Sequence, residues 1–126
     1  MYYELLAKIK NAQRMKKDAL LAPFSKMDFA VARLLVQARY LKDAQKKTIG
    51  HKQFLEVKLA YQGDKPALEE FRIRSKPSRR LYVGYQDLKA IRQGYGLAVI
   101  STPKGVLTNV EARKSKVGGE YLFEVW

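Results

Sequence analysis

The sequence has no cysteine and only one histidine, His51. Without cysteine, disulfides and thiolate ligands are excluded, and the chain suits a reducing compartment. One histidine cannot supply a two-histidine metal site, and a zinc ion would have to be held by carboxylates alone, so no metal site is predicted. His51 stands beside Lys52 at a predicted strand start, where a plain surface residue rather than a member of a catalytic triad is expected.

Acidic residues are scarce: 12 Asp and Glu stand against 25 Lys and Arg, which gives a net charge of +13. Residues 1–65 hold 14 basic and 6 acidic residues (+8) and residues 66–126 hold 11 and 6 (+5), so the excess is spread along the chain. Such an excess favours a polyanionic partner, because attraction to closely spaced phosphates grows with the number of cations. Nucleic acid is the first candidate, an anionic membrane the second, and a solvated basic surface remains the alternative.

Long apolar runs are also missing. No stretch approaches the roughly 18 apolar residues of a membrane span, and the first six residues are not followed by the apolar core of a signal peptide. The apolar fraction of 47% nevertheless favours a folded chain, and 126 residues suffice for one domain or two small lobes. A folded cytosolic protein is therefore predicted.

Residues 1–75 are predicted to form an α+β lobe. Its elements follow the order helix, strand, helix, strand, strand and are placed at 3–17, 20–23, 26–40, 55–61 and 71–73. The second helix has the clearest start, because Ser25 is a good N-cap residue, Asp28 follows three positions later, and Phe24 and Phe29 fall at the staple positions. The last two strands are predicted to pair through a turn at 62–66, with the helices on one face of the sheet.

A polar stretch with a proline at 75–80 marks the predicted boundary. Residues 76–126 are predicted to form a mostly antiparallel β lobe with short helices, packed on the first lobe, with strands at 81–83, 97–100, 106–108 and 121–126. A short helix anchored by Leu88 and Ile91 is predicted to stop at Gly94, and a helical turn capped by Asn109 to end at Gly118-Gly119.

Patterns that resemble catalytic motifs lack their context. Ser101 and Lys104 fit a Ser-x-x-Lys acylation motif, but Pro103 follows an apolar strand where a helix start is needed, and the two companion motifs are absent. Glu69 and Glu70 are adjacent and would point to opposite faces of a strand, so they do not form an acid–base pair. No enzymatic activity is predicted.

The hairpin tip at 101–105 supports two interpretations. Ser101 and Thr102 offer hydroxyls for phosphate, ribose or a base edge, Lys104 supplies a point charge, and Gly105 allows close backbone approach, all of which fit RNA contact. The same residues also suit an ordinary turn, because Pro103 and glycine favour turns and Ser and Thr bond their own backbone. The chemistry alone leaves both interpretations open.

A second candidate group interleaves cations with an aromatic ring. Arg79 and Arg80 are followed by Tyr82, a mixture that can grip an RNA backbone and stack on an unpaired base. The alternative is that Tyr82 belongs to the core and only the arginines reach solvent. Glu120 is an acid directly after Gly118-Gly119, where it could orient a lysine or accept a hydrogen bond from a base amino group or a ribose hydroxyl.

Several motifs spread over nearly the whole chain carry a resemblance to a known family. The densest group comprises the segments Ala98-Val99-Ile100-Ser101-Thr102-x-Lys104-Gly105-Val106, Ala112-Arg113 and Gly118-Gly119-Glu120. Further motifs are Lys8-Ile9-Lys10-Asn11-Ala12, Pro23-x-Ser25-Lys26, Ser75-x-Pro77 and Arg80-x-Tyr82. On these residues the sequence resembles the universal small-subunit ribosomal proteins of the S-eight family in their bacterial form.

The resemblance implies two α+β lobes, binding to the central domain of small-subunit ribosomal RNA early in assembly, and no cofactor. It implies contact between the tip (Ser101, Thr102, Lys104 and Gly105) and an irregular internal loop of an RNA helix, with Glu120 and Tyr82 as further RNA-binding residues. Neighbouring small-subunit proteins are implied as partners, and in some bacterial members the messenger of their own operon is bound as well. A membrane or a small-molecule substrate is not implied.

Two segments depart from the family pattern. The third loop position is often serine in bacterial relatives and is Pro103 here, which removes a backbone donor and a hydroxyl. The acid–glycine pair at the end of the second helix is replaced by Ala38-Arg39, so a different helix end is expected. The competing hypothesis is a basic adaptor that binds nucleic acid without sequence preference.

Overall fold

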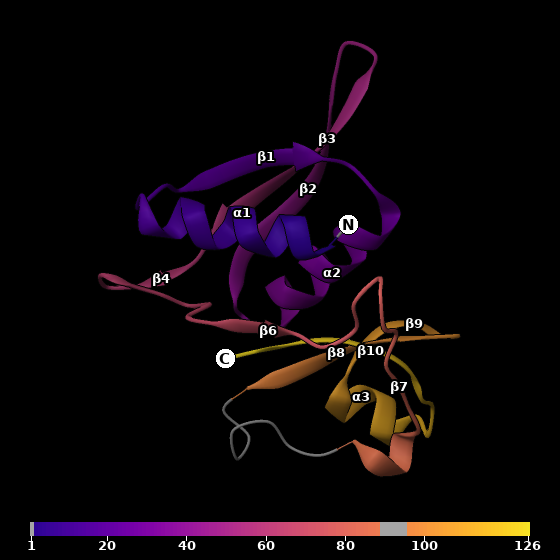
Figure 1. The fold of residues 1–126 in the computed structure, drawn as a ribbon. Coiled ribbons are helices and arrows are strands. Elements are labelled where there is room, and N and C mark those ends of the chain that lie inside the picture. The colour runs from indigo at the N-terminus through magenta and orange to yellow at the C-terminus, as the bar shows by residue number, and fades with distance from the viewer. Residues whose placement is uncertain (1, 89–95) are drawn as a thin grey trace. The chain divides into compact units, whose positions relative to one another are not determined.

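The chain has a mixed α+β fold with two compact units. The computed structural model describes residues 2–88 and 96–126, and the units are Met1–Glu69 and Glu70–Trp126 (Figure 1). The predicted α+β class is confirmed. The predicted boundary after residue 75 differs from this division, because the strand at Phe71–Ile73 pairs within the second unit.

The first unit contains a three-stranded antiparallel sheet and two helices. Its elements are α1 (Tyr2–Arg14), β1 (Ala19–Pro23), α2 (Lys26–Gln37), β2 (Leu41–Ile49), β3 (Lys52–Leu59) and the small hairpin of β4 (Tyr61–Gln62) and β5 (Lys65–Pro66). The sheet order is β1-β3-β2. Both helices end earlier than predicted, because Lys16 (φ 54°) and Arg39 (φ 69°) take the left-handed conformation that terminates a helix.

Strand β2 was not predicted, and it replaces the strand that was expected to pair with β3. The prediction paired Phe71 and Ile73 with the strand at 55–61, but that segment forms β6 (Phe71–Ile73), which pairs with β10 (Gly119–Val125) of the second unit. The prediction missed β2 because only Leu41 and Ala44 are buried along its length, so no apolar alternation marks it. Up to β3 the first unit therefore has the predicted order helix, strand, helix, strand, strand, but β2 and β3 take the places of the predicted strands at 55–61 and 71–73.

The start of α2 follows the sequence prediction. The Asp28 N–H donates to the Ser25 hydroxyl at 3.0 Å, and the rings of Phe24 and Phe29 lie 5.7 Å apart, as expected for an N-cap with a hydrophobic staple. Burial raises the pKa of Asp28, whose Oδ1 has no hydrogen-bond partner among the described residues. The core of the unit is formed by Leu5, Leu6, Ile9, Val31, Leu35, Leu55 and Val57.

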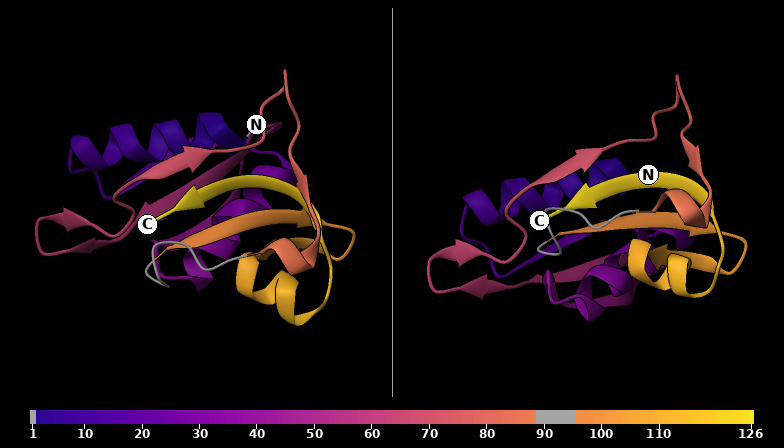
Figure 2. Two further views of the ribbon diagram at one scale, coloured as in Figure 1. Left: turned by 60° about the horizontal axis from the view of Figure 1, so that its bottom comes forward. Right: turned by 90° about the horizontal axis from the view of Figure 1, so that it is seen from below.

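The second unit is built around strand β10. Its other elements are β6, β7 (Tyr82–Val83), the 3-10 turn η1 (Tyr85–Asp87), β8 (Leu97–Thr102), β9 (Gly105–Thr108) and α3 (Asn109–Lys114). The sheet order is β6-β10-β8-β9, and β7 also pairs with β10. Helix α3 and η1 lie on one face of this sheet (Figure 2), where Leu88, Ala98, Ile100 and Ala112 form a core. The short helix predicted around Ile91 and Gly94 lies outside the described residues.

The cap of α3 corrects a prediction. Thr108, not Asn109, is the N-cap, and it forms a capping box with Glu111. Asn109 is already helical, and its buried Oδ1 accepts a hydrogen bond from the Ala98 N–H at 3.2 Å, which ties α3 to β8. The helix ends at Lys114, and Lys116 (φ 56°) takes the left-handed conformation just after it, so the helix stops before the glycine pair.

We expect Ser25→Ala to lower the free energy of unfolding by about 1 kcal/mol, because the Asp28 N–H loses its acceptor at the start of α2. Chemical denaturation monitored by circular dichroism measures this change. The control is Ser78→Ala, which alters an exposed hydroxyl outside any helix and should change the stability little. Equal stability of the two variants would contradict the capping role.

Candidate nucleic-acid interface

Three of the predicted site residues lie in one row across the second sheet. Tyr82 on β7 pairs with Glu120 on β10, and Glu120 pairs with Ser101 on β8. Directly paired residues of neighbouring strands point to the same face of a sheet, so the three side chains share a face. The row continues to Val106 on β9. We call Tyr82, Glu120 and Ser101 the polar row.

Tyr82 is the exposed end of the polar row. Its side chain is 69% exposed, which answers the question left open by the sequence: the ring does not belong to the core. An exposed tyrosine presents a flat apolar surface together with a hydroxyl, so it can stack on an unpaired base. Ser101 and Glu120 are partly buried beside it.

The hairpin tip adjoins the polar row. Thr102 pairs with Gly105, and Pro103 and Lys104 form the exposed turn between them. The Thr102 hydroxyl donates to the Gly105 carbonyl at 2.8 Å and accepts from the Lys104 N–H at 3.1 Å. Thr102 is only 9% exposed, so its hydroxyl fixes the turn from inside. Gly105 has φ 115°, a conformation that side chains disfavour.

Glu120 is held in place by two donors. Its Oε2 accepts hydrogen bonds from the Ser75 hydroxyl and from Nη1 of Arg80, the latter at 3.2 Å. Ser75 is fully buried, and its hydroxyl also accepts from the Leu81 N–H at 3.2 Å. The Glu120 carboxylate therefore orients Arg80. The sequence predicts a lysine or an RNA group as its partner, and the structure shows an arginine instead. Ser75 was not among the predicted site residues, although it lies in the Ser75-x-Pro77 motif.

Arg79 belongs to a turn next to the polar row in sequence. The turn is closed by two backbone hydrogen bonds between Lys76 and Arg79, at 3.1 and 2.9 Å. All residues from 76 to 80 are exposed, so this segment presents three cations to solvent. No hydrogen bond or ion pair joins Arg79 to the polar row among the described residues. Arg80 is thus connected to the row through Glu120, whereas Arg79 is only its neighbour in sequence.

Two glycines allow the strands to meet. A Cβ at Gly119 would lie 2.0 Å from the carbonyl oxygen of Ser101, and one at Gly118 would lie 2.3 Å from that of Val83. Such distances are impossible without moving the backbone, so only glycine permits this approach of β7 and β8 to β10. The glycines were predicted to end a helix; their function in the fold is to let the strands that carry the polar row lie together.

A second polar group lies on the opposite face of the sheet. A register shift between Tyr121 and Phe123 brings Tyr121 and Glu124 to the same face, where the Tyr121 hydroxyl donates to Glu124 at 3.0 Å. Arg74 pairs with Glu124 at 3.2 Å and lies 5.4 Å from the Tyr121 ring centre. Burial, together with the Glu124 charge, raises the pKa of Tyr121, so the phenol stays protonated. This group stabilises β6 and β10 and offers no reactive base.

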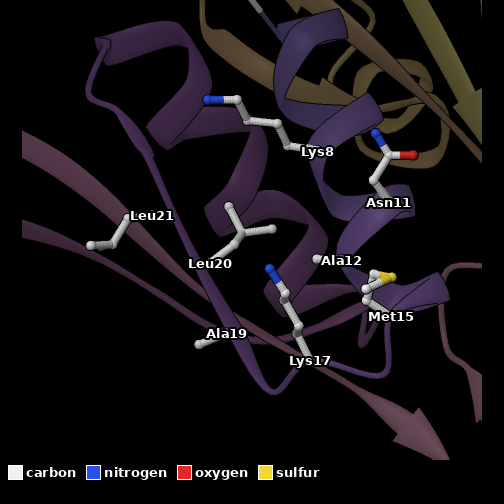
Figure 3. Close-up of a pocket in the computed structure, with 8 residues that line it drawn as sticks. All are labelled: Lys8, Asn11, Ala12, Met15, Lys17, Ala19, Leu20 and Leu21. Atoms are coloured by element: carbon white, nitrogen blue, oxygen red, sulfur yellow. The ribbon is translucent and has the colours of Figure 1, made fainter.

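The first unit contains a cavity of about 290 Å³ between α1 and β1 (Figure 3). Its lining is apolar around Ala12, Leu20 and Leu21, with Lys8 and Lys17 as the charged residues. Its lining contains no histidine, hydroxyl or carboxylate side chain. No group of three His, Asp or Glu suited to a metal ion exists within residues 2–88 and 96–126. Over the same ranges no helix is long and apolar enough to cross a membrane.

The fold and site define a basic α+β protein that presents an exposed aromatic ring, an arginine held by a carboxylate and a hydrogen-bonded hairpin tip. Residues 3–126 match the model of the family described as Ribosomal protein S8, and the chain belongs to this family. It is therefore a structural ribosomal protein and not an enzyme.

The relatives agree with this assignment. The chain is 41% identical over 123 residues to the small ribosomal subunit protein uS8 of Novosphingobium aromaticivorans, with 98% of this chain and 94% of the relative covered. It is 40% identical to the protein of the same name from Persephonella marina and 39% identical to that from Thermus thermophilus, with 98% of this chain and 95% of each relative covered.

We expect Gly119→Ala to destabilise the second unit by about 3 kcal/mol, because the added Cβ would force β8 away from β10. Thermal or chemical unfolding measures the change. The matched control is Gly84→Ala, where the nearest atom to the added Cβ is 3.9 Å away and φ is −83°, so the stability should change by less than about 0.5 kcal/mol. Similar stability of both variants would reject the close-approach explanation.

Proposed function

We propose that the chain is a component of the cytoplasmic small ribosomal subunit that binds small-subunit ribosomal RNA and helps to assemble the subunit. The observation that carries this proposal is the polar row beside a rigid hairpin tip, in a family member with a net charge of +13. The relatives are named as small-subunit proteins, which supports the same location. Neighbouring ribosomal proteins are then expected around the chain.

The proposed target is an irregular internal loop of an RNA helix. Regular A-form RNA hides its base edges in a deep, narrow groove, whereas an irregular loop exposes unstacked bases. Tyr82 would stack on such a base, and Ser101 and Glu120 beside it offer a hydroxyl and a carboxylate to base or ribose groups. Arg79, Arg80 and Lys104 would contact phosphates, which supply affinity without sequence information.

The internal hydrogen bonds of Thr102 give it a positioning role in this proposal. Its hydroxyl holds Lys104 and Gly105 in one turn, so the exposed tip meets the RNA already ordered. Pro103 restricts the turn further, because its φ is fixed. A messenger that mimics the ribosomal site would be bound by the same residues, so autoregulation by members of the family requires no second site.

We expect Lys104→Ala to weaken binding and to flatten the dependence of log Kd on log salt by about one unit, because one phosphate contact is lost. Filter binding at two or more salt concentrations measures both quantities. The RNA probes are a small-subunit hairpin with the irregular internal loop and the same hairpin fully paired. Native affinity and slope in Lys104→Ala would show that the tip does not contact RNA.

We expect Thr102→Val to reduce the preference for the irregular hairpin by about 1–3 kcal/mol, because the turn loses both side-chain hydrogen bonds. Thr102→Ser keeps the hydroxyl and serves as the control that should retain the preference. Thermal unfolding of each variant separates a disordered tip from an unfolded unit. A basic adaptor without sequence preference, the second candidate favoured by the net charge, predicts equal binding of both RNAs by the parent.

A further inference from the structure

Strands β2 and β3 continue as a hairpin beyond the rest of their sheet. Strand β1 pairs with β3 only as far as Pro23 and Phe54, whereas β2 and β3 continue to the pair Ile49–Lys52. Figure 1 shows this hairpin projecting past β1. We call residues 45–53 the β2–β3 arm. Every residue of the arm is exposed.

The arm is regular although nothing in the unit covers it. Two further pairs, Thr48–Gln53 and Ile49–Lys52, extend it to a two-residue turn in which Gly50 has φ 63°. A two-stranded hairpin outside a core is only marginally stable in water, and Ile49 is 51% exposed at its end. The arm thus has a fully paired backbone, a glycine where its turn needs one, and the exposed aliphatic side chain of Ile49. Together these features indicate that the arm binds a partner.

The charge of the arm indicates the kind of partner. Residues 45–53 contain three lysines and no acidic residue. Lys46 lies 5.0 Å from the Phe24 ring centre, which anchors it toward the unit. Lys47 pairs with Glu56 at 3.2 Å, but the Lys47 side chain is 53% exposed, so solvent weakens this ion pair. Lys52 makes no ion pair with any described residue.

The strand register places two of these lysines together. Lys47 and Ile49 are two residues apart on β2, and Lys52 pairs with Ile49, so the three side chains share one face. Lys47 and Lys52 are diagonal neighbours, which puts their Cβ atoms roughly 7–8 Å apart. The face thus presents two cations with an aliphatic side chain beside them, a pattern that fits the phosphates and sugars of a nucleic-acid backbone.

We propose that the β2–β3 arm is a second RNA-binding element, which contacts the ribosomal RNA backbone through Lys47 and Lys52 without reading its sequence. The inference rests on the proposed function of the chain but uses none of the residues of the polar row or the hairpin tip. RNA is favoured over an acidic protein surface because the chain belongs to a ribosomal family and the arm offers cations rather than a large apolar area.

The first test uses Lys47→Ala/Lys52→Ala in the full chain. Two lost phosphate contacts should lower the salt slope by about two units, and each should weaken binding about eightfold at 0.1 M salt. The probes are the RNA of the small-subunit central domain, the irregular hairpin and the fully paired hairpin. The charge-matched control, Lys42→Ala/Lys65→Ala, removes two exposed lysines outside the arm and should keep the slope of the parent.

A second variant shortens the arm by two residue pairs without changing the register. Deleting Thr48, Ile49, Lys52 and Gln53 joins Lys47 and Phe54 through the existing Gly50-His51 turn, and the side chains on both strands keep their faces. Only exposed residues are lost, so the unfolding temperature should stay within a few degrees of the parent value. Because Lys52 is lost and Lys47 is kept, its RNA binding should weaken by about eightfold at 0.1 M salt and its salt slope should fall by about one unit, half the change expected for the double alanine variant.

The outcomes separate the two proposals. Weaker binding to the central-domain RNA alone, or to all three RNAs, supports the arm, and the preference for the irregular hairpin should persist in both cases. Native affinity and slope in both arm variants would overturn the inference and leave an acidic protein surface as the partner of the arm. If the parent protein binds the irregular and the fully paired hairpin equally, the proposed recognition of the internal loop is rejected. Weaker binding of paired RNA by the arm variants would still support the arm in that case.

Discussion

The close approach of β7 and β8 to β10 is the constraint on which the polar row depends. Gly119 lies where a Cβ would collide with the Ser101 carbonyl, and Gly118 lies where one would collide with the Val83 carbonyl. Because these positions carry no side chain, Tyr82, Glu120 and Ser101 fall into one register across three strands. Every chemical property proposed for the site, from base stacking to hydroxyl contacts, requires this alignment.

The second requirement concerns Glu120, an acidic group that lies within the surface proposed to bind RNA. Glu120 would repel phosphates if it were free, but it accepts from Ser75 and Arg80. Its charge is therefore largely compensated, and it fixes the arginine side chain at the edge of the row. The half-buried Glu120 carboxylate thus orders the Arg80 side chain, and it lowers the net positive charge of this surface by one unit.

Local chemistry made several features predictable. Ser25, Phe24 and Phe29 define the start of α2 through contacts between residues close in sequence, and the structure has those contacts. The opposite holds for β2, which was missed because its backbone is paired while most of its side chains remain in solvent. Asparagine is a good N-cap residue, so the sequence predicts a cap at Asn109, but in the structure Thr108 is the N-cap and its hydroxyl accepts from the Glu111 N–H.

The sequence by itself determined the basic charge, the α+β class, the two-hydroxyl hairpin tip and the family, because these depend on composition and on residues near each other in the chain. Only the tertiary structure decided that β6 joins β10, that Tyr82 is exposed beside Glu120, and that the Thr102 hydroxyl is used within the turn. Strands β6 and β10 lie far apart in sequence, and periodicity identifies a strand without identifying the strand that it pairs with. The pairing of the strands then decides which of their side chains are exposed to solvent.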